Sequence, residues 1–468
     1  MKEKRLVLLK HLSEDNCMSN PANLKHLYFA AAIAALGGLL FGYDTAVIAG
    51  AIGYLETKFQ LTPAMTGWAA SSAIWGCVIG AMFAGYLSDR MGRKKVLILT
   101  AVLFAVSAIG SAIPRNLTEF VIARLIGGIG VGAASMLSPL YISEISPANK
   151  RGTLVTSYQL AIVLGINLIY FINMLIAGAG NEQWNIEFGW RYMLGSEVIP
   201  AALFLIALFF VPESPRWLAS KNRDAEALDI LEKLNGREHA NQVLQDVKQT
   251  LHTEKGTVAE LFAPGLRTAM IIGLFLALFS QITGINAIIY YAPEIFKSVG
   301  FGSNSALMQT VVIGITNTLF TFVAIRLIDR AGRRKLLLWG VSGMTICLIA
   351  VGIVYYLGFS NGPLLLIFIL GFIASFAFSL GPIPWVIISE IFPTKTRGIA
   401  MSFATFTLWI GVVLVTQLTP VLLATFGGAV TFWIFGGNAL LMLLFTYKMI
   451  PETKGKTLEE IEKYWTKH

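Results

Sequence analysis

The stretch GYLSDRMGRKK at residues 85–95 has a counterpart, IRLIDRAGRRK, at residues 325–335. Two further pairs of motifs follow in the same order: SEISPANKRG at 143–152 with SEIFPTKTRG at 389–398, and VPESPRW at 211–217 with IPETKGK at 450–456. The members of each pair are about 240 residues apart, and three ordered matches at nearly one offset indicate a duplicated unit.

The composition is typical of a chain that crosses a membrane many times. Charged residues make up only 13% of the 468 residues and apolar residues 55%, whereas about 25% of a soluble chain is charged. Apolar runs long enough to cross a bilayer as helices recur along the chain. We predict twelve spans, at 27–51, 66–87, 96–114, 119–140, 153–177, 191–211, 267–290, 305–328, 336–357, 363–388, 399–421 and 427–449. The predicted fold class is therefore an all-α membrane protein of two six-helix bundles, a parallel repeat that places a binding site between the halves.

Basic residues gather in alternate loops, which predicts the orientation of the spans. The loops on the basic side carry Arg90, Arg93, Lys94 and Lys95, then Lys150 and Arg151, then Arg330, Arg333, Arg334 and Lys335, then Lys395 and Arg397. Because such loops stay in the cytoplasm, both termini are expected to be cytoplasmic in a multi-pass protein of the cell membrane. The net charge of +9 reflects these loops rather than binding to nucleic acid.

Five parts are predicted along the chain: a cytoplasmic N-terminal tail at 1–26, a six-helix bundle at 27–211, a cytoplasmic helical linker at 212–266, a second six-helix bundle at 267–450 and a cytoplasmic C-terminal tail at 451–468. In the linker, Leu228, Leu231 and Leu234 are at helical spacing before Gly236. This pattern predicts short amphipathic helices rather than an enzyme domain.

Short motifs that suggest nucleotide binding do not fit their surroundings. Gly128 and Gly132 lie within an apolar run and follow no predicted strand, so they indicate close helix packing. The GKT at 455–457 lacks the glycine of a phosphate-binding loop, because Ile450 occupies that position. With no ATP motor and no metal or cofactor motif, we expect transport driven by a proton gradient. The three cysteines show no pairing or ligand pattern: Cys17, Cys77 and Cys347.

Three charged residues lie deep in predicted spans: Asp44, within GGLLFGYDTAVIAGA at 37–51, Arg124 and Glu197. Such residues tend to pair and to be functional, although a static ion pair is the alternative. Burial raises the pKa of an aspartate and a nearby cation lowers it. If Asp44 approaches Arg124 in only one state, its proton affinity differs between states, and each pKa unit supplies about 1.4 kcal/mol for coupling. Glu197 is the predicted third member, which tunes Arg124.

The motifs together resemble those of the sugar porter family of the major facilitator superfamily. The resemblance extends from Leu27 onward and includes both DR-x-GR loops, PESPRWL at 212–218, QITGIN at 281–286, GPIPW at 381–385 and PETKGKTLEEIE at 451–462. It implies a transporter rather than an enzyme. A monosaccharide would bind between two six-helix bundles that rock to alternate access, and we expect the chain to function as a monomer in the lipid bilayer.

The resemblance also extends to proton coupling. Bacterial members that couple sugar to protons carry an aspartate in GYDTAVI, paired with an arginine in the fourth span, and Asp44 and Arg124 occupy those positions. Animal facilitative glucose carriers have asparagine where Asp44 stands. The chain is therefore similar to the symporter branch, which imports a hexose or pentose with a proton, here carried by Asp44.

Sugar contacts implied by the resemblance are Gln159, Gln281, Asn286, Asn317 and Trp385, with Trp409 retained and Phe41 expected to face the cavity. Amides donate and accept hydrogen bonds without the cost of a charge, as sugar hydroxyls require. A tryptophan adds a flat apolar face and one N–H donor. The alternative for each single amide is a hydrogen bond between helices.

Three departures from the family pattern reduce the polar contacts expected from the second bundle. Ser280 replaces the first glutamine of a Gln-Gln pair before GIN, and Leu408 and Val412 stand where many relatives carry an amide. Ala377 replaces a glutamate eight residues before the GPIPW tryptophan of glucose facilitators. A pentose, a deoxy sugar and a water-filled site all fit these changes.

Gating residues are predicted on both sides of the membrane. Pro382 and Pro384 remove N–H donors and are expected to break or kink the tenth span. Gly284, Tyr290 and Tyr291 mark the outer part of the seventh span, which is expected to bend over the sugar. On the cytoplasmic side, ion pairs between Glu144 and Arg151, and between Glu390 and Arg397, are expected to close the inner gate alongside Arg93 and Arg333.

Other functions remain open at this stage. One is facilitated diffusion with a merely structural Asp44–Arg124 pair. Another is a non-transporting sugar sensor, although the tail after Pro451 is short for a signalling module. Transport of organic ions is a further alternative, but the predicted site lacks a matching charge beyond the proton pair.

Overall fold

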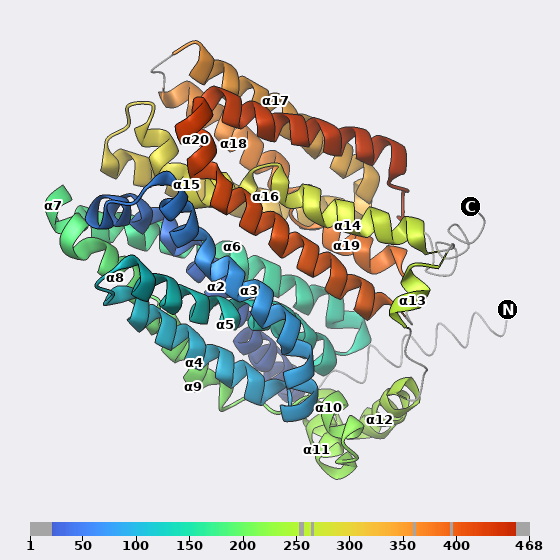
Figure 1. The fold of residues 1–468 in the computed structure, drawn as a ribbon. Helices are drawn as coiled ribbons and strands as arrows, with labels where there is room; N and C mark the ends of the chain where they lie inside the picture. The colour runs from blue at the N-terminus through green and yellow to red at the C-terminus, as the bar shows by residue number, and fades with distance from the viewer. Residues whose placement is uncertain (1–20, 252–256, 264–265, 359–361, 394–395, 455–468) are drawn as a thin grey trace.

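The computed structural model describes residues 21–251, 257–263, 266–358, 362–393 and 396–454, and every regular element in these ranges is a helix. The all-α prediction is confirmed. Two groups of helices lie side by side in Figure 1, one from α2 (Pro21–Phe59) to α9 (Val198–Leu208) and one from α14 (Arg267–Ile282) to α20 (Arg397–Met449). We call them the first and second bundles.

The other helices of the first bundle are α3 (Pro63–Met91), α4 (Arg93–Ala112), α5 (Leu117–Ile145), α6 (Ala148–Gly178), α7 (Glu182–Trp184), the π-helix η1 (Asn185–Gly189) and α8 (Trp190–Gly195). Close packing of α3 on α5 depends on glycine. A Cβ atom at Gly128 would collide with the carbonyl oxygen of Ala73, and one at Gly132 with that of Cys77. The prediction that these glycines serve helix packing is confirmed.

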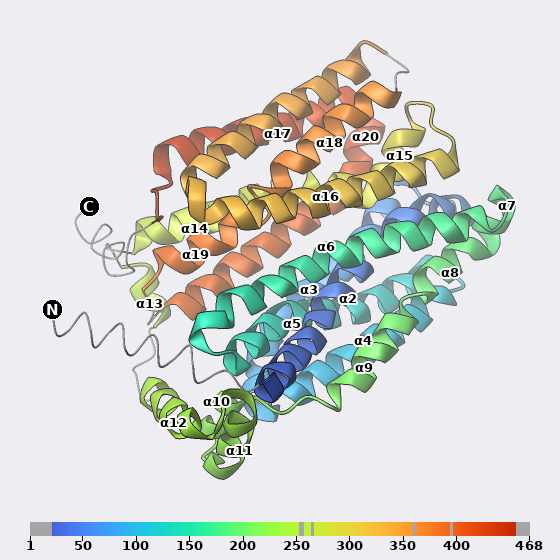
Figure 2. The same ribbon diagram turned by 180° about the vertical axis from the view of Figure 1, so that it is seen from behind.

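Between the bundles the chain forms α10 (Pro215–Ser220), α11 (Asp224–Asn235), α12 (Arg237–Leu251) and α13 (Val258–Leu261). Trp217, Leu231 and Leu244 belong to a small apolar core of their own, and Gly236 ends α11 with a φ of 84°. The predicted amphipathic helices are therefore present. In Figures 1 and 2, α10–α12 lie at one end of the molecule and α7 at the other. We call these the linker end and the α7 end.

The second bundle also contains α15 (Ile285–Lys297), α16 (Ser303–Ala331), α17 (Arg333–Tyr356), α18 (Gly362–Ala377) and α19 (Ile383–Ile391). Its helices are broken at three places, two within a span and one between spans. Gly284, with a φ of 93°, separates α14 from α15. The segment that leads to Pro382 and Pro384 separates α18 from α19, as predicted for that pair of prolines. Gly427, with a φ of 73°, breaks α20.

Ten helices in the described ranges are long and apolar enough to cross a membrane. That count treats the 53 residues of α20 as one helix, although the break at Gly427 divides it into the last two predicted spans. It also omits the tenth predicted span, which is formed by the short α18 and α19. The structure thus accommodates all predicted spans. Several predicted spans are shorter than the helices, because helices such as α2 continue beyond their apolar run, where hydrogen bonding along the backbone does not require apolar side chains. The sixth predicted span, in contrast, runs past the end of α9 at Leu208.

The two bundles touch at the α7 end. The Tyr170 hydroxyl of α6 donates to the carbonyl oxygen of Ile289 at 2.7 Å, and the Ser71 hydroxyl of α3 donates to Oε1 of Gln417 at 2.5 Å. The Gln417 amide also donates to the carbonyl oxygen of Ala64 at 3.3 Å. These contacts hold the bundles together at this end of the molecule.

Candidate functional site

Asp44, Arg124 and Glu197 meet inside the first bundle. Their exposed fractions are 0%, 1% and 1%. Nη1 of Arg124 donates to Oδ1 of Asp44 at 2.5 Å, and Nη2 donates to the main-chain oxygen of Asp44 at 2.9 Å. The three charges predicted to cooperate thus come from α2, α5 and the turn between α8 and α9, and they share one buried site.

Glu197 belongs to this site by position, without a direct bond to the arginine among the described contacts. It lies at the junction between α8 and α9, within electrostatic range of both Asp44 and Arg124. Within the part of the chain that the structure describes, three buried polar atoms of the group have no hydrogen-bond partner: Oδ2 of Asp44, Nε of Arg124 and Oε1 of Glu197. Two acids and one base form the group, so its full ionisation would leave one uncompensated negative charge in the bundle interior.

Small neighbours allow this approach of α2, α4 and α5. A Cβ atom at Gly127 would collide with the hydroxyl of Ser107 and lie 3.6 Å from Oδ1 of Asp44. Tyr43 and Ser196 share a hydrogen bond of 2.7 Å, which ties the residue before Asp44 to the residue before Glu197. Sequence reasoning missed Ser107 and Ser196. Their only signal was a small hydroxyl within an apolar span, which is common in membrane helices.

The amides expected to bind sugar in the second bundle are partly brought together. Nδ2 of Asn286 donates to Oε1 of Gln281 at 2.7 Å, and Nε2 of Gln281 donates to the Ser280 hydroxyl at 3.0 Å. That hydroxyl, 1% exposed, donates to the carbonyl oxygen of Ala277. Ser280 therefore lies behind Gln281 and orients it.

Phe41 of α2 and Trp409 of α20 lie against each other across the two bundles, with ring centroids 5.7 Å apart. The indole N–H of Trp409 is buried and finds no hydrogen-bond partner among the residues that the structure describes. Gln159 in α6, Asn317 in α16 and Trp385 in α19 are the other predicted contacts. Among the described residues, no hydrogen bond joins these three to the Gln281–Asn286 pair, and their role in sugar binding stays a prediction.

Tyr290 and Tyr291 are both buried in α15, directly after the break at Gly284. The hydroxyl of Tyr291 donates to the carbonyl oxygen of Thr416 in α20 at 2.9 Å. This hydrogen bond joins α15 to α20 within the second bundle. Its predicted gating role remains to be tested.

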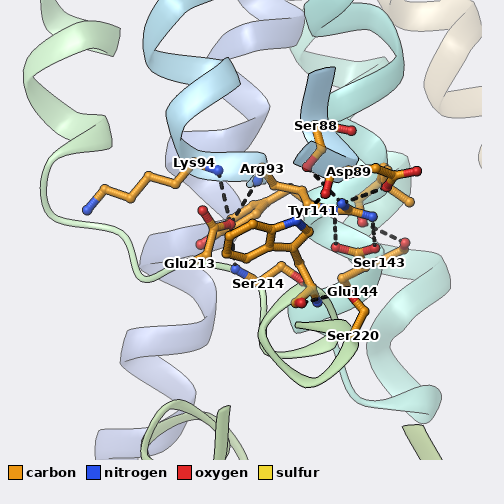
Figure 3. A network of polar contacts seen from close by, with 12 residues as sticks. Ser88, Asp89, Arg93, Lys94, Tyr141, Ser143, Glu144, Glu213, Ser214 and Ser220 are labelled. Atoms are coloured by element: carbon orange, nitrogen blue, oxygen red, sulfur yellow. Dashed lines mark hydrogen bonds and ion pairs between the residues drawn. The ribbon is translucent and has the colours of Figure 1, made fainter. Parts of the chain in front are cut away.

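At the linker end, the three motifs of the first repeat converge on Arg93 (Figure 3). Nε and Nη2 of Arg93 donate to the Glu144 carboxylate at 3.0 and 3.1 Å, and Nη1 donates to Asp89 at 2.9 Å. Oε1 of Glu213 accepts the main-chain N–H groups of Arg93 and Lys94 at 2.9 and 3.1 Å. One network thus links all three motifs of this repeat.

The second repeat builds a matching network. Nη2 of Arg333 donates to Oε1 of Glu390 at 3.1 Å. The Glu452 carboxylate accepts the main-chain N–H groups of Arg333 and Arg334 at 3.0 and 3.2 Å. The repeated sequence motifs therefore correspond to repeated contacts. In each half, an arginine side chain binds a glutamate at a helix end, and a second glutamate accepts the main-chain N–H of the same arginine.

The Glu144–Arg151 ion pair, predicted for the closed inner gate, is not among the described contacts of this structure, and its gating role stays a prediction. The two oxygens of the Glu144 carboxylate accept from the Nε–Nη2 edge of the Arg93 guanidinium. Arg151 instead donates to the carbonyl oxygens of Ser143 and Ser146 at 3.1 and 3.4 Å. The last carbonyl groups of a helix lack partners within it, and Arg151 lies close to those at the end of α5. In the repeat, Glu390 likewise pairs with Arg333, and Arg397 donates to the carbonyl oxygen of Phe392 at 3.3 Å.

Comparison with known proteins gives one consistent answer. A family model described as "Sugar (and other) transporter" matches residues 30–465. The chain belongs to this sugar transporter family. The predicted resemblance to sugar porters is thus confirmed over nearly the whole chain, and the multi-pass membrane architecture follows from it.

Similar members of the sugar transporter family include two curated proton symporters. The chain is 46% identical over 435 residues to an arabinose-proton symporter of Bacillus subtilis, covering 93% of this chain and 94% of that protein. It is 41% identical over 480 residues to a D-xylose-proton symporter of Escherichia coli K12, covering 96% and 97% of the two chains. The inward-open structure of a xylose transporter from E. coli matches with a TM-score of 0.84 at 40% identity, covering 94% of this chain and all of that one.

Proposed function

We propose that the chain is a sugar:proton symporter that imports a monosaccharide by alternating access, with Asp44 as the proton carrier. The observation that carries this proposal is the buried group of Asp44, Arg124 and Glu197. A net charge held in a bilayer interior is costly. One proton on either carboxyl makes the group neutral, so the site is built to hold a proton in one state of the cycle.

Helix α2 carries both Asp44 and a residue expected to face the sugar, Phe41. Phe41 and Asp44 are three residues apart on α2, so both side chains lie on neighbouring positions of one helix surface. Phe41 contacts Trp409 of the second bundle. A change in the Asp44–Arg124 pair that rotates or shifts α2 therefore moves the aromatic contact between the bundles, and this supplies a route from protonation to sugar binding.

A pentose is the substrate class that we favour. The chain carries Ser280 and Ala377 where larger polar residues are typical of the family, and Ser280 lies behind Gln281 rather than beside a ligand. Two of the similar proteins are named for arabinose and xylose. Gln159, Gln281, Asn286, Asn317 and Trp385 are the proposed contacts.

The linker end is proposed to face the cytoplasm, because the basic loops lie there. The bundles would then be closed at the outer side, and the resemblance to an inward-open xylose transporter agrees with this state. The Arg93 and Arg333 networks each join residues of one bundle. We propose that they keep the inner ends of the bundles rigid while these separate, in a protein that works as a monomer in the cell membrane.

Accumulation and exchange measured side by side test the proposal. In proteoliposomes with an inward proton gradient, the wild type is expected to accumulate D-xylose or L-arabinose, and a protonophore to abolish the accumulation. Asp44→Asn is expected to lose accumulation but to keep exchange of labelled for unlabelled sugar. Accumulation that survives Asp44→Asn would favour a uniporter or a different proton carrier.

A further inference from the structure

The hydroxyl of Ser107 in α4 is buried beside the proton site without a bond of its own. The residue is 0% exposed, and its Oγ finds no hydrogen-bond partner within the described residues. A buried hydroxyl that makes no hydrogen bond costs free energy. Such a cost is tolerated where the group gains a partner in another state of the protein.

Buried hydroxyls on this helix and its neighbour behave differently. A serine or threonine within a helix can donate to a carbonyl oxygen of the preceding turn. Thr100, also on α4, donates to the carbonyl oxygen of Leu97 at 2.7 Å, and Ser72 on α3 donates to that of Ala69 at 2.8 Å. The hydroxyl of Ser107 makes no such bond and lies against α5 instead.

Gly127 of α5 locates this hydroxyl relative to the proton carrier. A Cβ atom at Gly127 would collide with Oγ of Ser107 and lie 3.6 Å from Oδ1 of Asp44. The serine hydroxyl and the carboxylate therefore adjoin the same glycine, one from α4 and the other from α2. Gly127 is three residues after Arg124, so it lies on the same face of α5.

The Asp44 carboxylate has capacity for further hydrogen bonds. An ionised carboxylate offers roughly four lone-pair sites to donors, whereas among the described residues Nη1 of Arg124 is its one donor. Oδ2 of Asp44 is buried and finds no partner within the same part of the chain. A carboxylate short of donors and a hydroxyl without an acceptor thus lie beside one glycine.

We propose that Ser107 is a positioning residue of the proton site, whose hydroxyl donates to the Asp44 carboxylate when Arg124 moves away from it. A buried carboxylate that loses its cation needs another donor. A hydroxyl supplies one without a charge, and after rotation it also accepts from the protonated acid. This inference rests on the proposed symport and deepens it, because it names a group that sets the pH at which Asp44 takes up its proton.

Other groups around Asp44 are already committed or lie on other elements. Four titratable groups are within electrostatic range of Asp44: Arg124 of α5, Glu197 of the α8–α9 turn, Cys77 of α3 and Tyr290 of α15. On α6, which also packs along α2, the described contact is an uncharged amide, since Nδ2 of Asn173 donates to the carbonyl oxygen of Val47 at 3.2 Å. Ser107 is the contribution of α4.

The direction of the effect follows from the form of Asp44 that the hydroxyl stabilises. A hydrogen bond donated to an ionised carboxylate favours that form, and it is stronger than a bond between neutral groups. Loss of the hydroxyl therefore increases the affinity of Asp44 for its proton. Because transport requires the protonated acid, Ser107→Ala is expected to keep the protein active to more alkaline pH.

Equilibrium exchange of labelled D-xylose or L-arabinose in proteoliposomes, with the same pH on both sides, tests the proposal. Wild-type exchange is expected to fall as the pH rises through a midpoint. Ser107→Ala should move this midpoint by about one pH unit toward alkaline pH, the effect of losing one hydrogen bond to a charged acceptor. Ser107→Cys keeps a weaker donor and should move it less.

Two controls separate this role from a structural one. Ser72→Ala removes another fully buried hydroxyl, one that is bonded within its own helix, and is expected to keep the wild-type midpoint. Ser107→Ala is expected to unfold at the same or a higher temperature than the wild type, because it removes a buried hydroxyl without a partner. In Asp44→Asn, exchange should not depend on pH, and adding Ser107→Ala should change nothing.

The outcomes distinguish this inference from the symport on which it rests. A wild-type midpoint that Asp44→Asn abolishes but Ser107→Ala leaves in place, or moves toward acid pH, would overturn the role of Ser107 alone. An effect of Ser107→Ala in the Asp44→Asn background would overturn it too. Wild-type exchange without a midpoint, or a midpoint retained by Asp44→Asn, would refute Asp44 as the proton carrier and the inference with it.

Discussion

Arg124 donates two hydrogen bonds to Asp44, one to a carboxylate oxygen at 2.5 Å and one to the main-chain carbonyl oxygen at 2.9 Å. Only the first of these contacts depends on the charge of the carboxylate. Protonation of Asp44 therefore weakens the pair while the guanidinium stays on the backbone of α2. The helices α2 and α5 can change their relative position without parting, as a repeated transport cycle requires.

Breaking this pair from one side is expected to destabilise the protein. Arg124→Leu leaves the Asp44 carboxylate buried without a partner, at a cost of about 3–5 kcal/mol. The double variant Asp44→Asn/Arg124→Gln removes both charges and is expected to lose far less. Thermal unfolding in detergent compares the two variants. Equal losses would show that the charges do not interact as described.

Close packing of α3 on α5 gives a second prediction. Gly128→Ala is expected to cost about 1–3 kcal/mol, because its Cβ would collide with the carbonyl oxygen of Ala73. Gly85→Ala, on α3 with open space around it, is the control and is expected to be neutral or slightly stabilising. The melting temperature of the purified protein measures both. An unchanged melting temperature in Gly128→Ala would show that α3 and α5 do not pack as closely as described.

The aromatic contact between the bundles is expected to affect sugar binding. Phe41→Ala removes the ring that packs on Trp409 and should raise the KM for sugar about three- to tenfold, the effect of losing an aromatic pair. Phe83→Ala removes a ring that is 55% exposed on α3 and serves as the control. Initial uptake rates over a range of sugar concentrations distinguish them. Similar KM values for both variants would show that Phe41 does not contribute to sugar binding.

The network at the linker end is expected to control rate rather than affinity. Arg93→Lys keeps the charge but loses the bidentate hydrogen bonding to Glu144. A lysine ammonium cannot donate two parallel hydrogen bonds in the plane of the carboxylate as a guanidinium does. The maximal uptake rate should fall while the KM stays unchanged. Arg90→Lys, at an exposed position in the last turn of α3, is the control. A change confined to the KM would place Arg93 in the binding site instead.

The sequence alone predicted the helical elements and the three buried charged residues well. Apolar runs and basic loops are long, repeated signals, so the spans and the duplication were readable. Asp44, Arg124 and Glu197 were visible because charge is rare in such spans. The outcome that they share one site required the packing of three helix segments, which depends on Gly127 and Ser107 and leaves no distinctive pattern.

Pairing partners at the linker end were harder to predict. Glu144 and Arg151 are close in sequence and opposite in charge, yet Glu144 binds Arg93 from another loop. Sequence separation does not report which loop approaches a helix end, and helix-end carbonyl groups compete for the same arginine.

Sugar-induced proton movement tests the central claim most directly. Proteoliposomes in a lightly buffered medium, without an imposed gradient, receive D-xylose or L-arabinose while the external pH is recorded. The wild type is expected to make the medium more alkaline as sugar and protons enter together, and Asp44→Asn to leave the pH unchanged while still exchanging sugar. Sugar uptake by the wild type without any change in pH, or an undiminished change with Asp44→Asn, would contradict the account.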